Sequence, residues 1–454
     1  MRTALSLLSA CCLWAQVDAT VIQNATIHTV TNGSFNGKVV FQNGKIVEVG
    51  EKVLTPPGAK VIDAAGGHVM PGIIDSHTHI GAGSTAGINE GSIAVSSMVT
   101  VHDIIDPEDK HIYWALTGGV TTMHILHGSA NPIGGQNAIV KLRWGKTAEE
   151  LLFAGAPLTL KFALGENPKR SGGALAAVGT QRYPATRMGV EDVIREGLTE
   201  ARVYQKAWAD FRSGKGAEPR RDLKLDPLVE VLEGKRIVVC HAYRADEMLM
   251  MIRVADEFGF KLASFEHVQE GYKVAKEMAK HGVAGAGFAD WWAYKMEVID
   301  GIPYNMAIMT KKGVLTAINS DSTDGALMRR LNTEAAKTMK YGGLTKQEAL
   351  KLLTINPARH LKLDARVGSL EAGKDADLVI WNKHPLSSYA VAQKVFIDGV
   401  VYFDREADLQ RRAADAARKK ALEDKLRPAA APAMKKGGPP PSKKVGGAGQ
   451  EHAQ

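Results

Sequence analysis

Cysteine is scarce in this sequence, and long hydrophobic runs are almost absent. Only three cysteines occur in 454 residues, and two of them, Cys11 and Cys12, lie near the start. If that first segment is removed after synthesis, Cys240 alone remains and no intrachain disulfide can form. The one apolar run lies in the same segment, "MRTALSLLSACCLWAQVDAT". The sequence therefore excludes a disulfide framework and a bundle of membrane helices.

The first 19 residues have the pattern of a secretory signal peptide. Arg2 precedes the apolar run, and small residues suited to signal-peptidase cleavage follow at Ala15 and Ala19. We therefore expect an exported protein, periplasmic or secreted. Two other interpretations stay open: a lipoprotein signal in "LSAC", with Cys11 lipidated, and an ordinary N-terminal strand.

The excess of basic over acidic residues lies mainly in the C-terminal part of the sequence. The formal net charge is +8, and residues 405–454 contain twelve Lys and Arg against six Asp and Glu, so +6 of it lies there. The body is nearly neutral, which gives no basis for expecting a nucleic-acid partner. Good helix formers and mixed charge predict a solvated helix over 405–427. The Pro-, Gly- and Lys-rich remainder of the tail is predicted to be disordered.

Both ends of the remaining chain are rich in β-branched residues and turn signals. Residues 20–70 include "VIQNATIHTV" and "KVVFQNGKIVEVG", in which Asn43-Gly44 marks a hairpin turn. Residues 365–404 include "DADLVIWN" and "KVFIDGVVYFD", which are of the same type. We expect the two segments to form one small β domain built from both ends of the chain.

The middle of the chain, residues 71–364, alternates strand-like and helix-like segments. The strand-like runs include "GVTTMHIL", "LTLKFAL", "RIVVCHAY" and "VLTAINSDS". Repeated strand-helix units with right-handed crossovers build a parallel sheet, and about eight of them close into a (β/α)8 barrel of the TIM type. One strand is hard to place, because "NAIVKLR" at 137–143 is either a barrel strand or a hairpin outside the barrel.

Polar side chains recur where these strand-like runs end. His77 and His79 close "PGIIDSHTH", and because side chains alternate along a strand, both project from one face while Thr78 projects from the other. Asp75 shares the face of the two histidines. The other strand-end residues are Lys161, with Glu166 just beyond it, His241, His267 and Asp321. In a TIM barrel catalytic groups lie at the carboxyl ends of the strands, so we expect these residues to converge.

Four histidines and an aspartate at one edge favour a metal site. Imidazole and carboxylate suit Zn²⁺ and similar divalent ions, and a catalytic site keeps a position open for water. Such a metal lowers the pKa of that water to about 7. Asp321 is then the expected general base, and an amine leaving group would make the reaction amide hydrolysis. Taken singly, His241 or His267 is as readily a core histidine, and Asp321 a turn residue.

Five motifs together resemble the amidohydrolase superfamily: "PGIIDSHTH", "VVCHAY", "SFEHV", "NSDS" and "LTINPARHLKLDARVGSLEAGKDADLVIWN". The similarity runs from about residue 20 to residue 404 and is nearest to the imidazolonepropionase and Xaa-Pro dipeptidase-like group. The resemblance implies a metal-dependent (β/α)8 barrel over 71–364, with a β-sandwich formed by 20–70 and 365–404. It implies hydrolysis of a C–N bond, in an amide or cyclic amide, other than an ordinary peptide bond.

The resemblance also implies a ligand set for one or two Zn²⁺ ions. His77 and His79 resemble the first-strand ligands. His241 resembles the fifth-strand ligand, His267 the sixth-strand ligand, and Asp321 the eighth-strand ligand and base. The fourth-strand position is open between Lys161, which must be carboxylated to bind a divalent cation and would bridge two metals, and Glu166, which needs no modification.

Substrate recognition is expected in the loops after the strands. Lys169 and Arg170 are candidates for binding a substrate carboxylate, and Trp291 and Trp292 for covering an apolar or ring-containing substrate. Each is equally well explained as a surface or loop-packing residue. The expected substrate is a small amide or dipeptide-like molecule. The alternatives are an Xaa-Pro or N-acyl amino acid dipeptidase and a non-catalytic metal-binding barrel, and a homo-oligomer is compatible with all of them.

Overall fold

The computed structural model describes residues 19–426, except 83–86, 170–181, 290 and 292. Most of the expected signal peptide and the expected disordered tail lie outside the described residues. The chain separates into two units, one ending at Arg405 and one beginning at Glu406. The described part of the second unit belongs to helix α11 (Arg405–Leu426), in which Asp408 is the buried residue. No helix within the described ranges is long and apolar enough to span a lipid bilayer.

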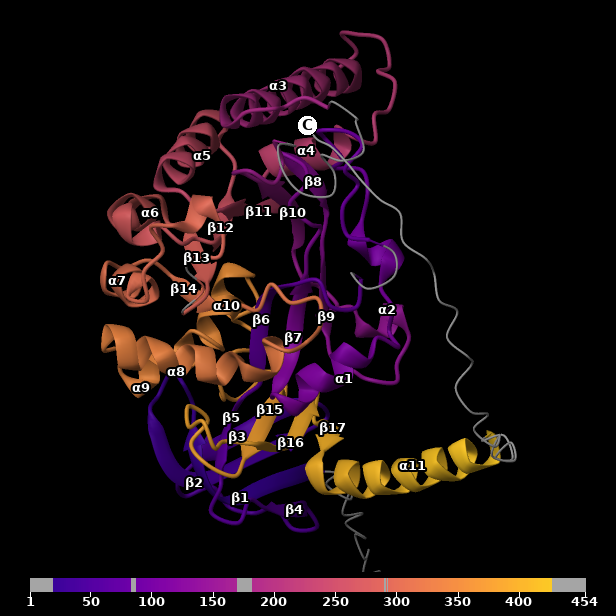
Figure 1. Ribbon diagram of the computed structural model, residues 1–454, viewed down its shortest axis with the longest axis vertical. Coiled ribbons are helices and arrows are strands. Elements are labelled where there is room, and N and C mark those ends of the chain that lie inside the picture. The colour runs from indigo at the N-terminus through magenta and orange to yellow at the C-terminus, as the bar shows by residue number, and fades with distance from the viewer. Residues whose placement is uncertain (1–18, 83–86, 170–181, 290, 292, 427–454) are drawn as a thin grey trace, which may run out of the picture. The chain divides into compact units, whose positions relative to one another are not determined.

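Strands from both ends of the first unit share one sheet, seen as the indigo and yellow strands in Figure 1. Its order is β17-β16-β15-β5-β1-β2-β3, with β4 beside β1. The bounds are β1 (Ala19–His28), β2 (Ser34–Gln42), β3 (Lys45–Gly50), β4 (Lys60–Asp63), β5 (His68–Pro71), β15 (Leu378–Trp381), β16 (Ala392–Ile397) and β17 (Val400–Asp404). β15 runs antiparallel to β5 and places Val379 opposite Met70. The expected domain boundaries, at residues 70/71 and 364/365, remain predictions.

Local sequence explains this sheet. Ile22 and Ile27 of β1 are fully buried and belong to a separate apolar core that also contains Phe41 and Phe396. The predicted hairpin between β2 and β3 is present, with Gln42 paired to Lys45. Its two turn residues, Asn43 and Gly44, have φ of +51° and +76°, a conformation that these residue types tolerate best.

A second set of strands occupies the middle of the chain. Five strands are parallel neighbours in the order β10-β11-β12-β13-β14, with β8 antiparallel beside β10. A three-stranded sheet has the order β6-β7-β9. The bounds are β6 (Ile73–Thr78), β7 (Val120–Ile125), β8 (Ile133–Gln136), β9 (Ala138–Lys141), β10 (Leu158–Ala163), β11 (Arg236–Ala242), β12 (Leu262–His267), β13 (Ala284–Gly287) and β14 (Thr316–Ile318). The segment 137–143 contains β9, which is antiparallel to β7 and so is not one of the parallel strands.

Backbone hydrogen bonds connect the two strand sets. The amide of Asp321 donates to the carbonyl of His77 at 2.8 Å, and the amide of His79 donates to the carbonyl of Ser322 at 2.9 Å. The end of β6 is therefore tied to the segment that follows β14. Every residue of β7 and β11 is buried, the pattern of strands covered on both faces.

Helices cover the outer side of the parallel strands, and Figure 1 shows α5, α6 and α7 in line outside β12, β13 and β14. The bounds are α1 (Lys110–Thr117), α2 (Ala148–Leu151), α3 (Arg187–Arg212), α4 (Asp226–Leu232), α5 (Ala245–Phe258), α6 (Ala275–His281), α7 (Asn305–Lys311), α8 (Leu331–Gly342), α9 (Lys346–Lys351) and α10 (Ile355–His360). The first unit is thus a mixed α/β structure with a parallel sheet, as the alternation of segments predicts.

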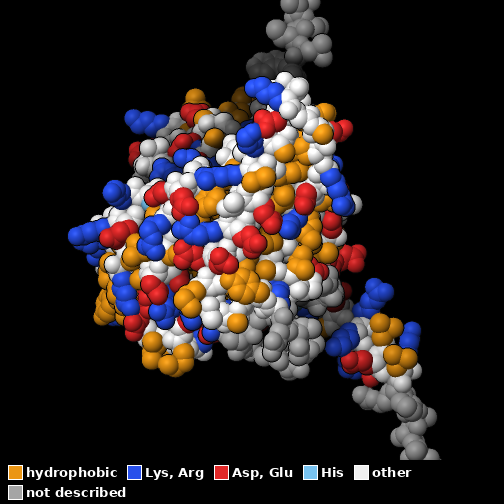
Figure 2. Space-filling model, turned by 90° about the horizontal axis from the view of Figure 1, so that it is seen from above, with side chains coloured by type: hydrophobic (Ala, Val, Ile, Leu, Met, Phe, Trp, Pro, Cys, Tyr) orange, Lys and Arg blue, Asp and Glu red, His pale blue; other side chains and the backbone are white. Residues whose placement is uncertain are grey.

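Positive and negative charges are mixed on one face of the molecule. On the face shown in Figure 2, Lys and Arg side chains lie among Asp and Glu side chains, and no large region of one sign stands out there. A surface that binds nucleic-acid phosphates gathers basic residues on one face. The distribution on this face matches the nearly neutral composition of the body.

A buried cluster of charges links β9 to the segments flanking β15 and β16. The Nζ of Lys141 lies 2.7 Å from Asp375 Oδ2, 3.0 Å from Asp377 Oδ2 and 2.5 Å from Asp398 Oδ1. Lys141 is fully buried. Burial alone would lower the pKa of Lys141, but the three carboxylates outweigh burial and raise it. The amine is therefore a counter-ion that all three aspartates share, while Arg366 also pairs with Asp375 and Arg143 with Asp398.

We expect Lys141→Met to destabilise the protein by about 3–5 kcal/mol, because it removes the ammonium partner of the buried Asp377 carboxylate. The matched control is Lys146→Met, whose ammonium lies 3.4 Å from Glu150 at the surface. That change should cost less than about 1 kcal/mol. Urea unfolding of both variants measures the difference, and equal midpoints would contradict the structural role of the cluster.

Two fully buried histidines make stability depend on pH. Burial lowers the pKa of His124 and of His360 from 6.5 to about 3. Below pH 6.5 the unfolded chain therefore binds protons that the folded chain does not bind until about pH 3. The contribution of each histidine to stability is complete above pH 6.5 and is lost as the pH falls.

We expect the free energy of unfolding to fall by about 1.4 kcal/mol per pH unit for each of these histidines as the pH decreases from 6.5 towards 3. Urea unfolding at a series of pH values measures the slope. The variant His360→Gln lacks a titratable group at this position. Its free energy of unfolding should therefore fall less steeply with decreasing pH, by the contribution of one histidine. An unchanged slope would mean that His360 is protonated in the folded state.

Candidate metal centre

The strand-end residues of the second strand set converge at one edge. His77 is the last residue but one of β6, and His79 follows that strand. Lys161 lies in β10, His241 in β11, His267 ends β12, and Asp321 follows β14. Because β10 to β14 are parallel, their carboxyl ends meet at the same edge. The structure therefore brings these six sequence-predicted residues together.

The distances are those of a compact ligand cluster. His77 Nε2 lies 3.2 Å and His79 Nε2 3.1 Å from Asp321 Oδ1, and one ligand atom of each residue lies within 4.8 Å of the others. Lys161 Nζ lies 3.3 Å from His77 Nε2. The ring centres of His241 and His267 are 4.4 Å apart, and His267 Nδ1 lies 3.7 Å from Asp321 Oδ2. All are buried except the Asp321 side chain, which is 25% exposed.

Unpaired nitrogen atoms show that the cluster fits a metal. His241 Nε2 and His267 Nδ1 are buried and have no hydrogen-bond partner among the described residues. A buried polar atom without a partner costs free energy, and a metal ion supplies the missing partner. Imidazole nitrogens with one carboxylate are a donor set that Zn²⁺ accepts.

The electrostatics favour the ligand forms of His77 and Asp321. Burial, followed by repulsion from Lys161 and His267, lowers the pKa of His77 well below its usual range, so its imidazole is neutral. Burial would raise the pKa of Asp321, but attraction to His267 and His79 outweighs it and lowers this pKa to about 2. Asp321 is therefore an ionised carboxylate at neutral pH.

Hydrogen bonds to the Nδ1 atoms orient two of the candidate histidine ligands. His79 Nδ1 lies 2.9 Å from the carbonyl of Leu126, and His241 Nδ1 lies 2.9 Å from Ser129 Oγ. In both rings Nδ1 is occupied by this hydrogen bond, so Nε2 is the nitrogen available to bind a metal ion. Such outer partners fix the tautomer and the orientation of a metal-binding histidine.

The backbone is strained at two of these positions. His267 and Asp321 have φ of +74° and +46°, in the left-handed region that non-glycine residues rarely adopt. The amide of Asp321 is held by the carbonyl of His77. Strain of this kind persists where the surrounding structure enforces it, often at functional sites.

The two candidates for the fourth-strand position lie in different places. Lys161 is fully buried within the cluster. Burial lowers the pKa of Lys161, although the charges of Glu266 and Asp321 oppose that effect. The Glu166 side chain is 39% exposed and its Oε1 lies 3.6 Å from Lys295 Nζ. Among the described contacts, none joins Glu166 to the histidines, so the geometry favours Lys161.

The predicted substrate residues are only partly described. Trp291 is 37% exposed and stacks on Phe288 at 4.5 Å, and Phe288 stacks on His267 at 5.6 Å. Trp291 also lines a cavity of about 410 Å³ together with Asp321. Lys169 is half-buried and has no contact that reaches the cluster among the described residues. Arg170 and Trp292 lie outside the described residues.

Glu266, a carboxylate next to His77, is not among the residues that the sequence predicted for the site. Glu266 Oε2 lies 3.4 Å from His77 Nδ1 and accepts a hydrogen bond from Asn319 Nδ2 at 2.9 Å. Glu266 Oε1 accepts one from Ser264 Oγ at 2.5 Å. Burial raises its pKa. The only feature of the local sequence that could have indicated a role for Glu266 is its position next to His267 in "SFEHV".

A pair of tyrosines was missed as well. The ring of Tyr243 stacks on His267 with centres 4.9 Å apart, and Tyr294 donates its hydroxyl proton to the Tyr243 oxygen at 2.9 Å. Burial raises the pKa of Tyr294 to about 12, so this hydroxyl stays protonated. Tyr243 follows His241 by two residues, and the alternation of side chains along a strand could have placed it on the same face.

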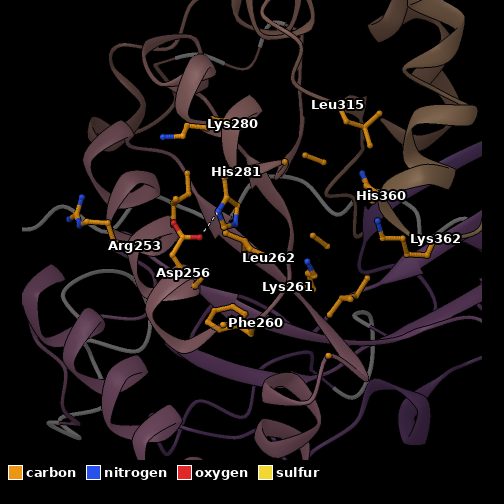
Figure 3. A pocket seen from close by; sticks show the side chains of 18 of the residues that line it. Arg253, Asp256, Phe260, Lys261, Leu262, Lys280, His281, Leu315, His360 and Lys362 are labelled. Atoms are coloured by element: carbon orange, nitrogen blue, oxygen red, sulfur yellow. Dashed lines mark ion pairs between the residues drawn. The ribbon is translucent and has the colours of Figure 1, made fainter.

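A large cavity lies at the other end of the parallel strands (Figure 3). It measures about 1040 Å³ and is lined by the first residues of β11 and β12, such as Ile237 and Leu262. Asp256 and His281, at the carboxyl ends of α5 and α6, form an ion pair of 3.0 Å there. Size alone does not make this cavity the site, because the histidine cluster is at the opposite strand ends.

Comparison with known proteins identifies the family. The sequence model of the amidohydrolase family matches residues 304–402. A crystal structure of an amidohydrolase from Thermotoga maritima MSB8 is 37% identical, with a TM-score of 0.79, over 85% of this chain and 100% of that one. The chain therefore belongs to the amidohydrolase superfamily, as the motifs predict.

Two curated relatives show the range of activities. Amidohydrolase tasK of Hapsidospora irregularis is 31% identical over 81% of this chain, and the match spans only 40% of tasK. An imidazolonepropionase of Pseudomonas paraeruginosa is 25% identical over 81% of this chain and 92% of that protein. The superfamily comprises hydrolases of C–N bonds that bind divalent metal ions.

We expect Lys161→Ala to remove at least one metal ion per chain, because the change deletes the fourth-strand donor from the buried cluster. Glu166→Gln is the matched control and should leave the metal content unchanged. Elemental analysis of the two purified variants measures both numbers. If short carboxylates such as propionate restore activity to Lys161→Ala, the missing group is an anion rather than an ammonium. Metal loss in Glu166→Gln alone would reverse the assignment.

Proposed function

We propose that this protein is a metal-dependent hydrolase that cleaves the C–N bond of a small amide or cyclic amide. The observation that carries the proposal is the cluster at the strand ends, where two imidazole nitrogens lie 3.2 Å and 3.1 Å from one ionised carboxylate oxygen. His241 Nε2 and His267 Nδ1 have no hydrogen-bond partner among the described residues. Membership of the amidohydrolase superfamily supports the same chemistry.

The proposal includes a closed (β/α)8 barrel beside a β-sandwich. The hydrogen bonds between His77 and Asp321 and between His79 and Ser322 support closure at one seam. At the other seam β8 pairs with β10 and the adjoining β9 pairs with β7, so the two short antiparallel strands bridge the gap. This arrangement would also account for the burial of every residue in β7 and β11.

Zn²⁺ is the metal that we propose, in one or two copies. His77, His79, His241, His267 and Asp321 would be its ligands. Lys161 would contribute as a carbamate: its buried neutral amine adds to CO₂, forms an N–C bond and releases one proton. The lowered pKa of Lys161 supports this step, because the neutral amine is the nucleophilic form.

When bound, the metal supplies Lewis acidity for the substrate carbonyl and a water molecule with a lowered pKa. Asp321 accepts a proton from the attacking water and delivers it to the nitrogen of the leaving group. Its pKa of about 2 keeps it ready as a base at neutral pH. Tyr243 lies against His267 at the edge of the cluster and can donate a hydrogen bond to the oxygen on which charge develops.

The cavity beside Asp321 supports a ring-containing substrate with a carboxylate. Trp291 offers an aromatic face, and Arg330 lines the same cavity of about 410 Å³. An Xaa-Pro or N-acyl amino acid dipeptidase is the second candidate function, because its substrates carry a carboxylate that Arg330 could bind. A non-catalytic barrel is disfavoured, since all the predicted ligands except Glu166 lie together in the cluster.

We further propose that the protein is exported. Ala19 is buried as the first residue of β1 and is paired with Gln42. Cleavage after Ala15 would leave β1 whole, whereas cleavage after Ala19 would remove this residue. The intact mass of the mature protein distinguishes the two positions, and an uncut chain would argue against export.

We expect Asp321→Asn to lower kcat by about 10²–10⁴ fold, because the variant lacks the base. The matched control is Asp324→Asn, a nearby aspartate that accepts hydrogen bonds from Ser322 and Ala326. A panel of N-acyl amino acids, dipeptides and cyclic amides, assayed with metal content measured in parallel, tests the proposal. Zn²⁺-loaded wild type without activity on any of these compounds would refute it.

We expect Arg330→Ala to raise KM for substrates with a free carboxylate by about tenfold or more, while leaving neutral cyclic amides unaffected. Arg329→Ala is the matched control, because Arg329 lies over the ring of Trp114 instead. A selective effect favours the dipeptidase. An equal change in KM for both substrate classes would mean that Arg330 does not bind the substrate carboxylate.

A further inference from the structure

Three histidines that the candidate metal centre does not use gather on the sheet built from both chain ends. His28 is the last residue of β1, His68 is the first residue of β5, and His384 follows β15 closely. β5 lies between the other two strands, with His68 opposite Thr26 of β1 and opposite Trp381 of β15. Two of the histidines therefore lie on neighbouring strands of one sheet, and the third lies in the segment that follows the next strand.

Two of the rings already face each other nitrogen to nitrogen. His28 Nε2 lies 3.0 Å from His68 Nδ1. The ring centres are 5.2 Å apart for His28 and His68, 4.9 Å for His28 and His384, and 5.6 Å for His68 and His384. Two imidazole nitrogens bound to one tetrahedral Zn²⁺ are separated by about 3.4 Å, so only a small opening is needed between His28 and His68.

The remaining ring nitrogens of His28 and His384 have partners that fix those two rings. His28 Nδ1 lies 2.8 Å from Ser34 Oγ, and His384 Nδ1 accepts a hydrogen bond from the amide of Leu386 at 3.2 Å. The atoms left to converge are therefore His28 Nε2, His68 Nδ1 and His384 Nε2. Partners of this kind orient metal-binding imidazoles.

The three rings are neutral, as metal ligands must be. Burial lowers the pKa of His28 to about 3 and that of His384 to about 4, and it lowers that of His68 as well. Neutral imidazole binds transition metals such as Zn²⁺ and Cu²⁺ rather than Mg²⁺ or Ca²⁺.

We propose that His28, His68 and His384 form a second metal site, which takes a divalent transition-metal ion and ties the N-terminal strands to the C-terminal strands. His384 must rotate to complete the site, because the three ligand nitrogens do not all lie within 4.8 Å of one another. A cavity of about 460 Å³ beside His28 and His384 leaves room for that rotation and for a water as fourth ligand. This site is independent of the proposed function.

One residue opposes the metal. Lys346 lines the same cavity, and its charge contributes to the lowered pKa of all three histidines. No carboxylate lines that cavity. The affinity for a metal ion therefore depends on attraction by the imidazole nitrogens and on repulsion by the ammonium group of Lys346. Removing this positive charge should tighten metal binding.

The test uses the full mature chain with its first metal centre loaded with Zn²⁺. Titration with Cu²⁺, followed by electron paramagnetic resonance and metal analysis, should reveal one further ion per chain with nitrogen ligands and a higher Tm. His384→Ala should abolish that extra ion while leaving kcat unchanged. Ser34→Ala should weaken its binding by about 10–100 fold, as expected for loss of an orienting partner.

Two variants make the result decisive. Lys346→Gln should tighten Cu²⁺ binding, which a merely structural histidine cluster would not do. His281→Ala removes a histidine that is paired with Asp256 elsewhere on the chain and should leave the extra ion in place. If wild type and His384→Ala bind the same number of Cu²⁺ ions, or if Lys346→Gln has no effect on affinity, the three histidines are only a hydrogen-bonded packing cluster.

Discussion

Two backbone hydrogen bonds hold the candidate metal centre together. The amide of Asp321 bonds to the carbonyl of His77, and the amide of His79 bonds to the carbonyl of Ser322. They set the register between the end of β6 and the segment after β14, which are more than two hundred residues apart in sequence. The short distances between the two imidazoles and the Asp321 carboxylate follow from that register. A shift by one residue would turn the histidines to the other face of β6.

The same edge of the strands combines burial with charge. Neutral imidazoles, a buried lysine and an ionised aspartate lie close together, and each unpaired group is costly in a medium of low dielectric constant. Glu266 behind His77 and Ser129 behind His241 reduce that cost and aim the rings. A metal ion would supply the partners that His241 Nε2 and His267 Nδ1 lack. The site therefore suits a cation, and the aromatic rings of Tyr243 and Phe288 both pack against His267.

Polar clusters also tie the chain ends to the body of the first unit. Lys141 of β9 bonds to three aspartates around β15 and β16, so the strand set with the histidines and the sheet of both chain ends share one buried network. The three histidines on β1, β5 and the segment after β15 lie across the sheet that joins the two ends. Both clusters link residues that are distant in sequence, and both are invisible as local motifs.

The sequence by itself determined the family, the alternating strands and helices, the hairpin at Asn43-Gly44 and the face shared by His77 and His79. These features depend on periods of two residues and on short motifs, which are local. Tertiary structure alone decided that Lys161 rather than Glu166 lies among the histidines, that "NAIVKLR" is antiparallel, and that Glu266 and Tyr294 reach the site. It also decided the pairing of His28 with His68. The physical reason is that strand register and loop paths arise from packing between segments far apart in sequence, and no local propensity records them.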